Sequence, residues 1–278
     1  MIDRLRHPDE GRYFKLAVVA TVPLLFIGLL MVVGTMGGLL LAVALVLPML
    51  WLSIRMMEAH FKANLVKVST LNFPEVKAII DEARERLDYK PEVDAYVRSG
   101  DANAVLYKLF RTKMMVIHAE FIDAASREEL VWLVGRFIGS LKAKHDRLTV
   151  LSALIGISEK LVFLNLLLYP YERAVVHSAD QMGLFLCGNL KAALTALNRT
   201  VVGKGLHRHV TVEGMLQQKR EIDGRFLPGL VRLFSTHPHV VDRHANMLRF
   251  AGEHMPEARA AYDAAAANEP KPVFKAAA

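Results

Sequence analysis

The hydrophobic pattern of the chain is dominated by one long stretch, from Leu16 to Ile54, that contains no ionisable side chain. A single helix needs only about 20 residues to cross a bilayer, so this stretch has room for two crossings. The sequence Gly-Thr-Met-Gly-Gly at 34–38 lies near its middle and supplies a flexible turn. The pattern therefore predicts a transmembrane hairpin with helices at Leu16–Val33 and Leu39–Ile54.

The charges that flank this stretch predict its orientation. Basic residues precede and follow it, namely Arg4, Arg6, Arg12 and Lys15 on one side and Arg55, Lys62 and Lys67 on the other. Because segments rich in Lys and Arg stay in the cytoplasm, we expect both ends on the cytoplasmic side of the cytoplasmic (inner) membrane. A cleavable signal peptide fits poorly, since the stretch is too long for one. The alternative is a buried helix pair inside a soluble protein.

After the hairpin the pattern predicts one more helix and then several short strands. Residues 72–89 place apolar side chains at helical spacing, with Asn72 as a candidate N-cap and Pro74 in the first turn. Short runs rich in β-branched and aromatic residues follow at 92–99, 102–110 and 113–123. These runs predict a small antiparallel sheet.

The second half of the chain is predicted to be helical. Ser126 and Glu129 have the spacing of a capping box and open an apolar helix. Residues 148–173 form two apolar runs, each too short to span a bilayer, that we expect against the membrane or the core; a third and fourth crossing is the alternative. Residues 173–202 predict two helices that break at Gly188–Asn189. The helical segment 210–236 and one more helix after Pro238 follow.

Composition divides the chain into three parts. We predict a basic N-terminus and hairpin at 1–60, one globular domain at 61–257 and a disordered Ala-rich tail at 258–278. The formal charge of +7 suits an anionic bilayer surface, and no basic motif interleaved with aromatic residues points to nucleic acid. The single cysteine, Cys187, excludes an internal disulfide and is expected to be a small buried hydrophobe.

Five short motifs occur in an order that is informative as a set. They are Pro74–Glu75, Asn103–Ala104, Glu128–Leu130, Ala179–Asp180 with Gly183, and Ser235–Pro238 with Arg243. With them the chain resembles, over residues 70–253, the HtpX-like and CAAX-prenyl-protease-like membrane zinc metallopeptidases. The resemblance implies an α+β, mostly helical fold: a zincin-like peptidase domain with a small antiparallel sheet behind the transmembrane hairpin.

The same resemblance shows that the zinc-binding motif of that family is degenerate here. In the family, the helix after the acidic entry carries Gly-His-Glu-x-Gly-His, and a Glu four residues before the Asp of the Ala-Asp pair is the third ligand. The two glycines are kept as Gly135 and Gly139, and the four chemical positions are occupied by Arg136, Phe137, Ser140 and Val176. The resemblance therefore implies a member with no catalytic residues and no metal ligands.

Elementary chemistry explains why these replacements matter. A catalytic zinc needs three donors with lone pairs, and a guanidinium is always cationic. A phenyl ring at Phe137 cannot accept a proton from a zinc-bound water. We expect Arg136 to fill the vacated space and pair with Asp180, which the resemblance places behind the family's metal; the alternative is that Arg136 points to solvent.

A relocated zinc site stays open as an alternative. The candidate ligands among the histidines of the chain are His145, His177, His237, His239 and His244. Imidazoles are common zinc ligands, but we expect His237 with Pro238 to fix a turn and the others to lie on a solvated face.

These points predict a membrane-anchored pseudoprotease, more a scaffold or adaptor than an enzyme. Its expected partners are the lipid bilayer and a polypeptide held by strand addition along Asn103, Ala104, Val105 and Leu106. One alternative is a zinc metalloendopeptidase with unconventional ligands. Another is a subunit of a larger membrane complex, in which the hairpin packs on partner helices through Gly28, Gly34, Gly37 and Gly38.

Overall fold

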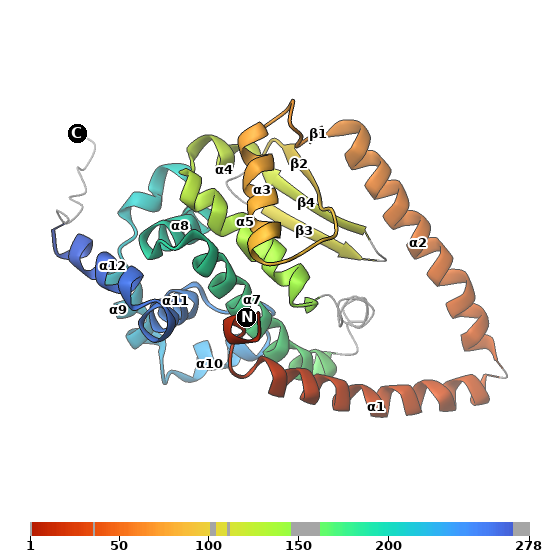
Figure 1. Ribbon diagram of the computed structural model, residues 1–278. Coiled ribbons are helices and arrows are strands. Elements are labelled where there is room, and N and C mark those ends of the chain that lie inside the picture. Colours follow the sequence, from red (N-terminus) through yellow and green to blue (C-terminus); the bar gives the residue numbers. More distant parts are fainter. Residues whose placement is uncertain (1, 36, 101–103, 110–111, 146–161, 269–278) are drawn as a thin grey trace, which may run out of the picture.

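The computed structural model describes residues 2–268 except 36, 101–103, 110–111 and 146–161. It consists of a helical domain with a small sheet, from which two long helices project (Figure 1). The prediction of a mostly helical α+β fold is confirmed.

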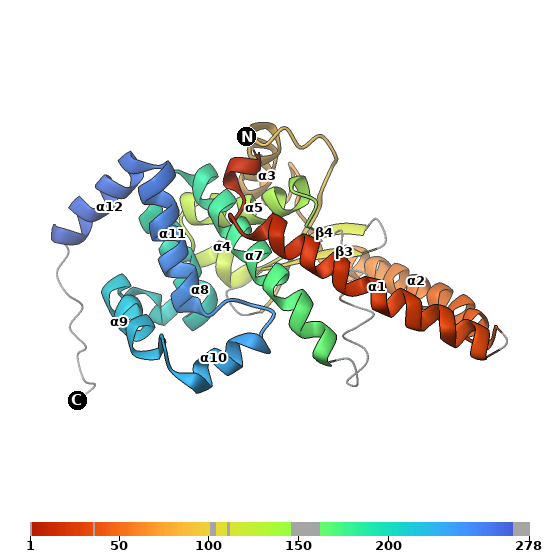
Figure 2. The same cartoon turned by 90° about the horizontal axis from the view of Figure 1, so that it is seen from below.

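The two long helices are α1 (Glu10–Gly34) and α2 (Gly38–Asn64), joined near the predicted turn; they diverge from it (Figure 1), and α2 continues past the predicted end at Ile54. Gly37 adopts a left-handed backbone with a φ of 87°, which a glycine tolerates without a steric penalty. The segment Leu40–Asn64 of α2 is long and apolar enough to cross a membrane, with a mean hydropathy of 2.1. Only 6% of its most apolar window is buried, and α2 projects from the domain (Figure 2), so the alternative of a buried helix pair is wrong.

The base of the hairpin is rooted in the globular domain. A short 3-10 helix, η1 (Ile2–Leu5), precedes α1, and Leu5 is 5% exposed within the main hydrophobic core. Arg6 donates to the carbonyl oxygen of Ala143 at 2.8 Å. Residues 2–10 therefore belong to the domain by packing, although the sequence analysis grouped them with the hairpin.

The sheet contains β1 (Val66–Lys67), β2 (Asp94–Arg98), β3 (Ala104–Leu109) and β4 (Thr112–His118), in the order β1-β2-β4-β3. The prediction of an antiparallel sheet is wrong for one pair, because β2 and β4 are parallel. Strands β3 and β4 form an antiparallel hairpin, but β4 rather than β3 lies beside β2, so β2 and β4 run in the same direction.

The burial of β4 agrees with this central position. Met114, Met115, Val116 and Ile117 are each at most 1% exposed, and so continuous an apolar run is typical of a strand covered on both faces. Strand β3 is left at the edge of the sheet.

Helices cover the sheet and build the rest of the domain. Their bounds are α3 Pro74–Arg86, α4 Ala119–Ala124, α5 Arg127–Lys142, α7 Val162–Cys187, α8 Leu190–Leu206, α9 Val212–Ile222, α10 Phe226–Leu233, α11 Val240–His254 and α12 Pro256–Asn268, with a 3-10 turn η4 at His207–His209. The break at Gly188–Asn189 is confirmed, and Gly188 has a φ of 68°.

Local signals at helix ends are partly confirmed. Ser126 caps α5 by accepting from the backbone N–H of Glu129 at 3.2 Å. The Glu129 side chain does not return to complete the capping box, because it pairs with Arg199 at 2.8 Å. Pro74 begins α3, but the N-cap is Phe73 rather than Asn72.

Two predictions for the second half of the chain need correction. The predicted disordered tail is helical up to Asn268, in α12, since alanine has the highest helix propensity and Tyr262 packs on the core. The second apolar run of 148–173 belongs to α7, which continues through Pro170 as one helix; residues 146–161 lie outside the described residues.

Helices α5 and α7 cross at very short range, which places the candidate site. A Cβ added to Gly183 would lie 2.5 Å from the carbonyl oxygen of Trp132, and one added to Gly139 would lie 2.6 Å from the Cβ of Met182. The glycines thus allow the two backbones to approach, and side chains next to them on both helices meet directly.

Candidate functional site

The centre of the candidate site is Asp180, a fully buried carboxylate on α7. Arg243 of α11 donates two hydrogen bonds to this carboxylate, from Nε to Oδ2 at 2.7 Å and from Nη2 to Oδ1 at 2.8 Å. This is the bidentate fork that arginine and carboxylate groups form most favourably. The sequence analysis noted Arg243 only as part of a motif and missed this contact.

Arg136 of α5 approaches the same carboxylate from the other side. Its Nε lies 2.7 Å from Oδ1 of Asp180, and its side chain is 17% exposed. The Nε–H is not directed at that oxygen, so the contact is one of opposite charges more than a directed hydrogen bond. The guanidinium also lies 4.8 Å from the ring centroid of Trp132, within cation–π range.

The electrostatics of this triad keep all three groups charged at neutral pH. Burial by itself would raise the pKa of Asp180, but Arg243 and Arg136 outweigh it and hold that pKa below its usual value. Burial lowers the pKa of Arg136 to about 10, with Asp180 opposing that shift. The site is therefore an ionised carboxylate held between two guanidinium groups.

Ser140, which the sequence analysis aligned with the family's second histidine, belongs to a separate buried network. Its hydroxyl lies 3.2 Å from Nδ1 of His145, whose Nε2 lies 3.2 Å from Glu10. Ser178 also donates to Glu10. These side chains are nearly inaccessible, so they tie the start of α1 to α5 and α7 rather than meet a substrate. The prediction that His145 is solvated is wrong, and the sequence analysis missed Glu10.

Phe137 and Val176, the other two positions named in the sequence analysis, carry no side-chain atom that could bind a metal. Phe137 packs against the main hydrophobic core, and Val176 is half-buried on α7, one turn before Asp180. In the part of the chain that the structure describes, no group of three or more His, Cys, Asp or Glu side chains is placed to hold a metal ion. The described residues do not fit a zinc ion of the kind that the resemblance implies.

His244 and His237, two further candidate metal ligands, are each held by hydrogen bonds within the domain or its turns. His244 is fully buried, and its two ring nitrogens lie 2.9 Å from the carbonyl oxygen of Val240 and 2.7 Å from the amide oxygen of Asn198. The prediction of a solvated face is wrong for it too. Ser235 donates to the carbonyl oxygen of His237 at 2.6 Å, so His237 does lie in a turn before α11.

Burial is the main influence on the pKa values of both His177 and Cys187. Burial lowers the pKa of His177 to about 4, so its imidazole is neutral at pH 7. Burial raises the pKa of the Cys187 thiol to about 11, which agrees with its expected role as a small hydrophobe.

The predicted polypeptide-binding strand corresponds to the first half of β3. Ala104, Val105 and Leu106 pair with Ile117, Val116 and Met115 of β4. Asn103 lies outside the described residues. Since β3 is last in the strand order, its second edge has no strand beside it among the described residues.

Comparisons with known proteins agree with this arrangement at the level of the family. The model of peptidase family M48 matches residues 70–250, which run from just before α3 into α11. A comparison with curated proteins found no match, and a comparison with solved structures found none either.

Proposed function

The chain belongs to peptidase family M48, and from that premise we propose that it is a membrane-anchored pseudoprotease that binds polypeptides without cutting them. The observation that carries the proposal is the contact between Arg136 and Asp180 at 2.7 Å. A positive side chain occupies the position at which a working relative would place its first zinc ligand.

Charge and donor chemistry both argue against zinc at this position. Arg136 and Arg243 already surround Asp180, so a divalent cation beside them would meet two positive charges in a poorly solvated site. Neither Phe137 nor Val176 offers a lone pair to a metal, and a phenyl ring at Phe137 cannot take a proton from a metal-bound water. The same helices are kept, but the reaction is not supported by their side chains.

The edge of the sheet supports a binding role. An extended polypeptide can add to a free strand edge through backbone hydrogen bonds, whatever its sequence. In β3 this edge runs along Ala104, Val105 and Leu106. The protein would then act as a scaffold or adaptor that holds a segment of a partner.

The hairpin supports anchoring in a bilayer. The segment Leu40–Asn64 qualifies as a span, and α1 carries an uncharged run from Leu16 to Val33 with exposed side chains such as Val19 at 65%. In this proposal both helices cross the inner membrane, and the basic flanks keep the globular domain on the cytoplasmic side.

A binding and cleavage assay tests the proposal. Full-length protein in detergent is mixed with unfolded, fluorescein-labelled casein; the expected result is saturable binding with no release of labelled fragments, with or without added zinc. Casein cleavage that depends on zinc would instead favour a metalloendopeptidase with unconventional ligands.

Two neighbouring proline variants provide the matched control. In an antiparallel edge strand, adjacent residues point their N–H groups to opposite sides. Of Val105→Pro and Leu106→Pro, one removes an N–H that faces β4 and lowers thermal stability, whereas the other removes an outward N–H. The outward variant should keep its stability and weaken casein binding; unchanged binding in both variants would rule out strand addition.

Open space along the hairpin favours a second role, as a subunit of a larger membrane complex. A Cβ added to Gly28 or Gly34 would meet no atom within 4 Å, so another helix could approach closely there. Purification in a mild detergent should then yield a defined complex that a Gly28→Leu variant disrupts.

A further inference from the structure

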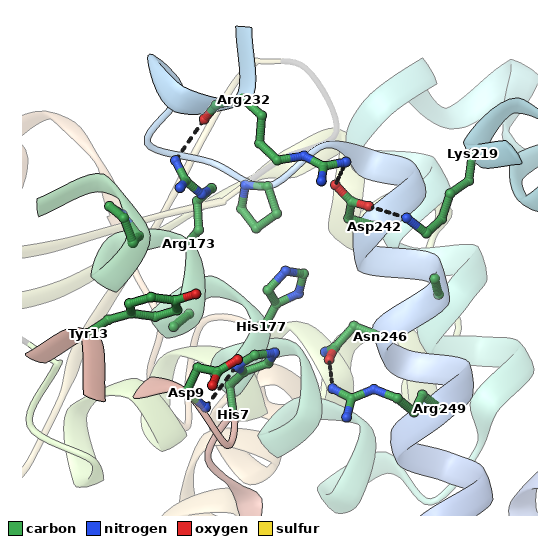
Figure 3. Close-up of a pocket in the computed structure, with 14 residues that line it drawn as sticks. His7, Asp9, Tyr13, Arg173, His177, Lys219, Arg232, Asp242, Asn246 and Arg249 are labelled. Atoms are coloured by element: carbon green, nitrogen blue, oxygen red, sulfur yellow. Dashed lines mark hydrogen bonds and ion pairs between the residues drawn. The ribbon is translucent and has the colours of Figure 1, made fainter. Parts of the chain in front are cut away.

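A cavity of about 410 Å³ lies beside the candidate site, where the base of α1 meets α7, α9, α10 and α11 (Figure 3). Its lining holds four cationic side chains, those of Arg173, Lys219, Arg232 and Arg249, against two carboxylates, those of Asp9 and Asp242. The polar residues that matter are Tyr13, Arg173, His177, Arg232, Asn246 and Arg249.

At one end of this cavity the charged side chains are paired with one another. Asp242 pairs with Lys219 at 2.8 Å and with Arg232 at 3.0 Å. These three side chains form the closed group at the upper right of Figure 3. They leave no carboxylate oxygen over for the rest of the cavity.

The other end holds arginines whose nearest partners are neutral. Arg173 donates to the backbone carbonyl oxygens of Arg232 at 2.7 Å and Ser235 at 2.9 Å. Arg249 donates to the amide oxygen of Asn246 at 3.0 Å, and its closest carboxylate, on Glu253, is 3.8 Å away and 52% exposed. Two guanidinium charges thus face the cavity without a close counter-ion among the described residues.

Two buried nitrogen atoms at the cavity also lack hydrogen-bond partners. Nδ1 of His177 and Nε of Arg232 are shielded from solvent and have no hydrogen-bond partner among the described residues. The ring of His7 stacks on that of His177, with centroids 5.2 Å apart. Burial lowers the pKa of Arg173 most strongly, and the positive charge of Arg232 acts in the same direction, whereas Tyr13 and Asp242 oppose these effects.

The position of the cavity limits the source of such an anion. Tyr13, at its wall, lies one helical turn before the uncharged run of α1 begins at Leu16. On the other side of α7, the short helix α10 exposes large apolar side chains, with Phe226 at 80% and Leu227 at 68%. Figure 1 shows α1 and α10 on the same lower side of the molecule. Arg232 belongs to α10 and to the cavity wall, so an apolar surface and a cationic cavity are continuous.

We propose that this cavity binds a phosphate group, and that the guanidinium groups of Arg173 and Arg249 are its main ligands. Phosphate oxygens accept several hydrogen bonds at once and suit arginine better than a single carboxylate does. The group is supplied either by the headgroup of an anionic lipid, with its acyl chains toward α1 and α10, or by a free phosphate ester. This inference does not depend on the loss of peptidase chemistry.

Binding to the full-length protein in an uncharged, phosphate-free detergent tests the proposal. Calorimetric titrations use inorganic phosphate and glycerol 3-phosphate in one arm, and dihexanoyl phosphatidylglycerol below its micelle concentration in the other. Saturable binding of the lipid that exceeds that of the free phosphates identifies a lipid site; the reverse order identifies a free phosphate ester. No saturable binding in either arm overturns the proposal.

Charge-removing variants assign the ligands. Arg249→Gln and Arg173→Gln should each weaken binding by about tenfold or more, since each loses a charge-assisted hydrogen bond. Arg127→Gln is the matched control, because Arg127 is 66% exposed and pairs with Glu82 far from the cavity. Arg173→Lys covers the case in which Arg173→Gln fails to fold, and should retain part of the affinity. Wild-type affinity in Arg249→Gln and in whichever Arg173 variant folds would overturn the assignment.

Discussion

Arg136 and Asp180 face each other across the crossing of α5 and α7, with Nε of the arginine 2.7 Å from Oδ1 of the aspartate. Arg243 completes the cluster from a third helix. The carboxylate is fully buried, so its charge is stable only because these two cations compensate the loss of solvation. The cluster therefore joins α5, α7 and α11.

Removal of the carboxylate is expected to be the most damaging change in this cluster. Asp180→Asn leaves two buried or half-buried guanidinium groups facing each other, and should lower the free energy of unfolding by about 3–5 kcal/mol. Arg136→Ala should cost less, about 1–3 kcal/mol, because Asp180 keeps its fork with Arg243. Chemical denaturation in detergent measures both.

The control for these variants is Arg127→Ala, which removes an arginine that is 66% exposed. Its effect should stay within about 0.5 kcal/mol. If Arg136→Ala were no more destabilising than this surface variant, the contact with Asp180 would not contribute to the free energy of unfolding.

Stability should fall as the pH is lowered from neutral. The pKa of folded His177 is about 4, below its ordinary value of 6.5, so the unfolded chain takes up a proton first as the pH falls between these values. Its contribution is complete above pH 6.5 and is lost on the way to pH 4. The lowered pKa of Asp180 adds a second loss at still lower pH, as the pH falls through its folded pKa.

Unfolding free energies measured from pH 7.5 to pH 4.5 check the first of these losses. The variant His177→Gln should show a shallower decline over this window, because it has no imidazole to protonate. If the unfolding free energy had the same slope against pH in the variant and the wild-type protein, His177 would not contribute to the loss of stability.

The glycines at the helix crossing make a further prediction. In Gly183→Ala, the new Cβ would lie 2.5 Å from the carbonyl oxygen of Trp132, so α5 and α7 must move apart. A loss of about 1–3 kcal/mol is expected, as for other overpacked cores. Gly252→Ala in α11 is the matched control, since nothing lies within 4 Å of its added Cβ.

Thermal unfolding of the two alanine variants should therefore diverge. Gly252→Ala should be neutral or slightly stabilising, because alanine has the higher helix propensity. Equal melting temperatures for both variants would mean that the crossing is looser than described.

Features that depend on neighbouring residues were predictable from the sequence. The hairpin follows from an uncharged run with glycines in its middle, and the start of α5 follows from Ser126 three residues before Glu129. The break after Cys187 follows from a glycine that can adopt a positive φ. Each of these signals lies within one or two helical turns of the structure that it predicts.

Features that depend on distant contacts were not predictable in the same way. Nothing local distinguishes the buried Glu10 from Asp9 beside it, since burial arises only when α1 meets Ser178 and His145. The fork on Asp180 comes from Arg243, 63 residues later in the chain. The parallel pairing of β2 with β4 had one visible signal, the unbroken apolar run Met114–Ile117, which is typical of a strand covered on both faces.

The most direct test of the central claim is the zinc content of the full-length protein. The chain is purified in detergent, dialysed against zinc, washed free of excess metal and analysed by inductively coupled plasma mass spectrometry. The account predicts zinc far below an equimolar amount, with no change in melting temperature on addition of a chelator. An equimolar amount of tightly held zinc, with a melting temperature that falls when a chelator removes it, would contradict the account.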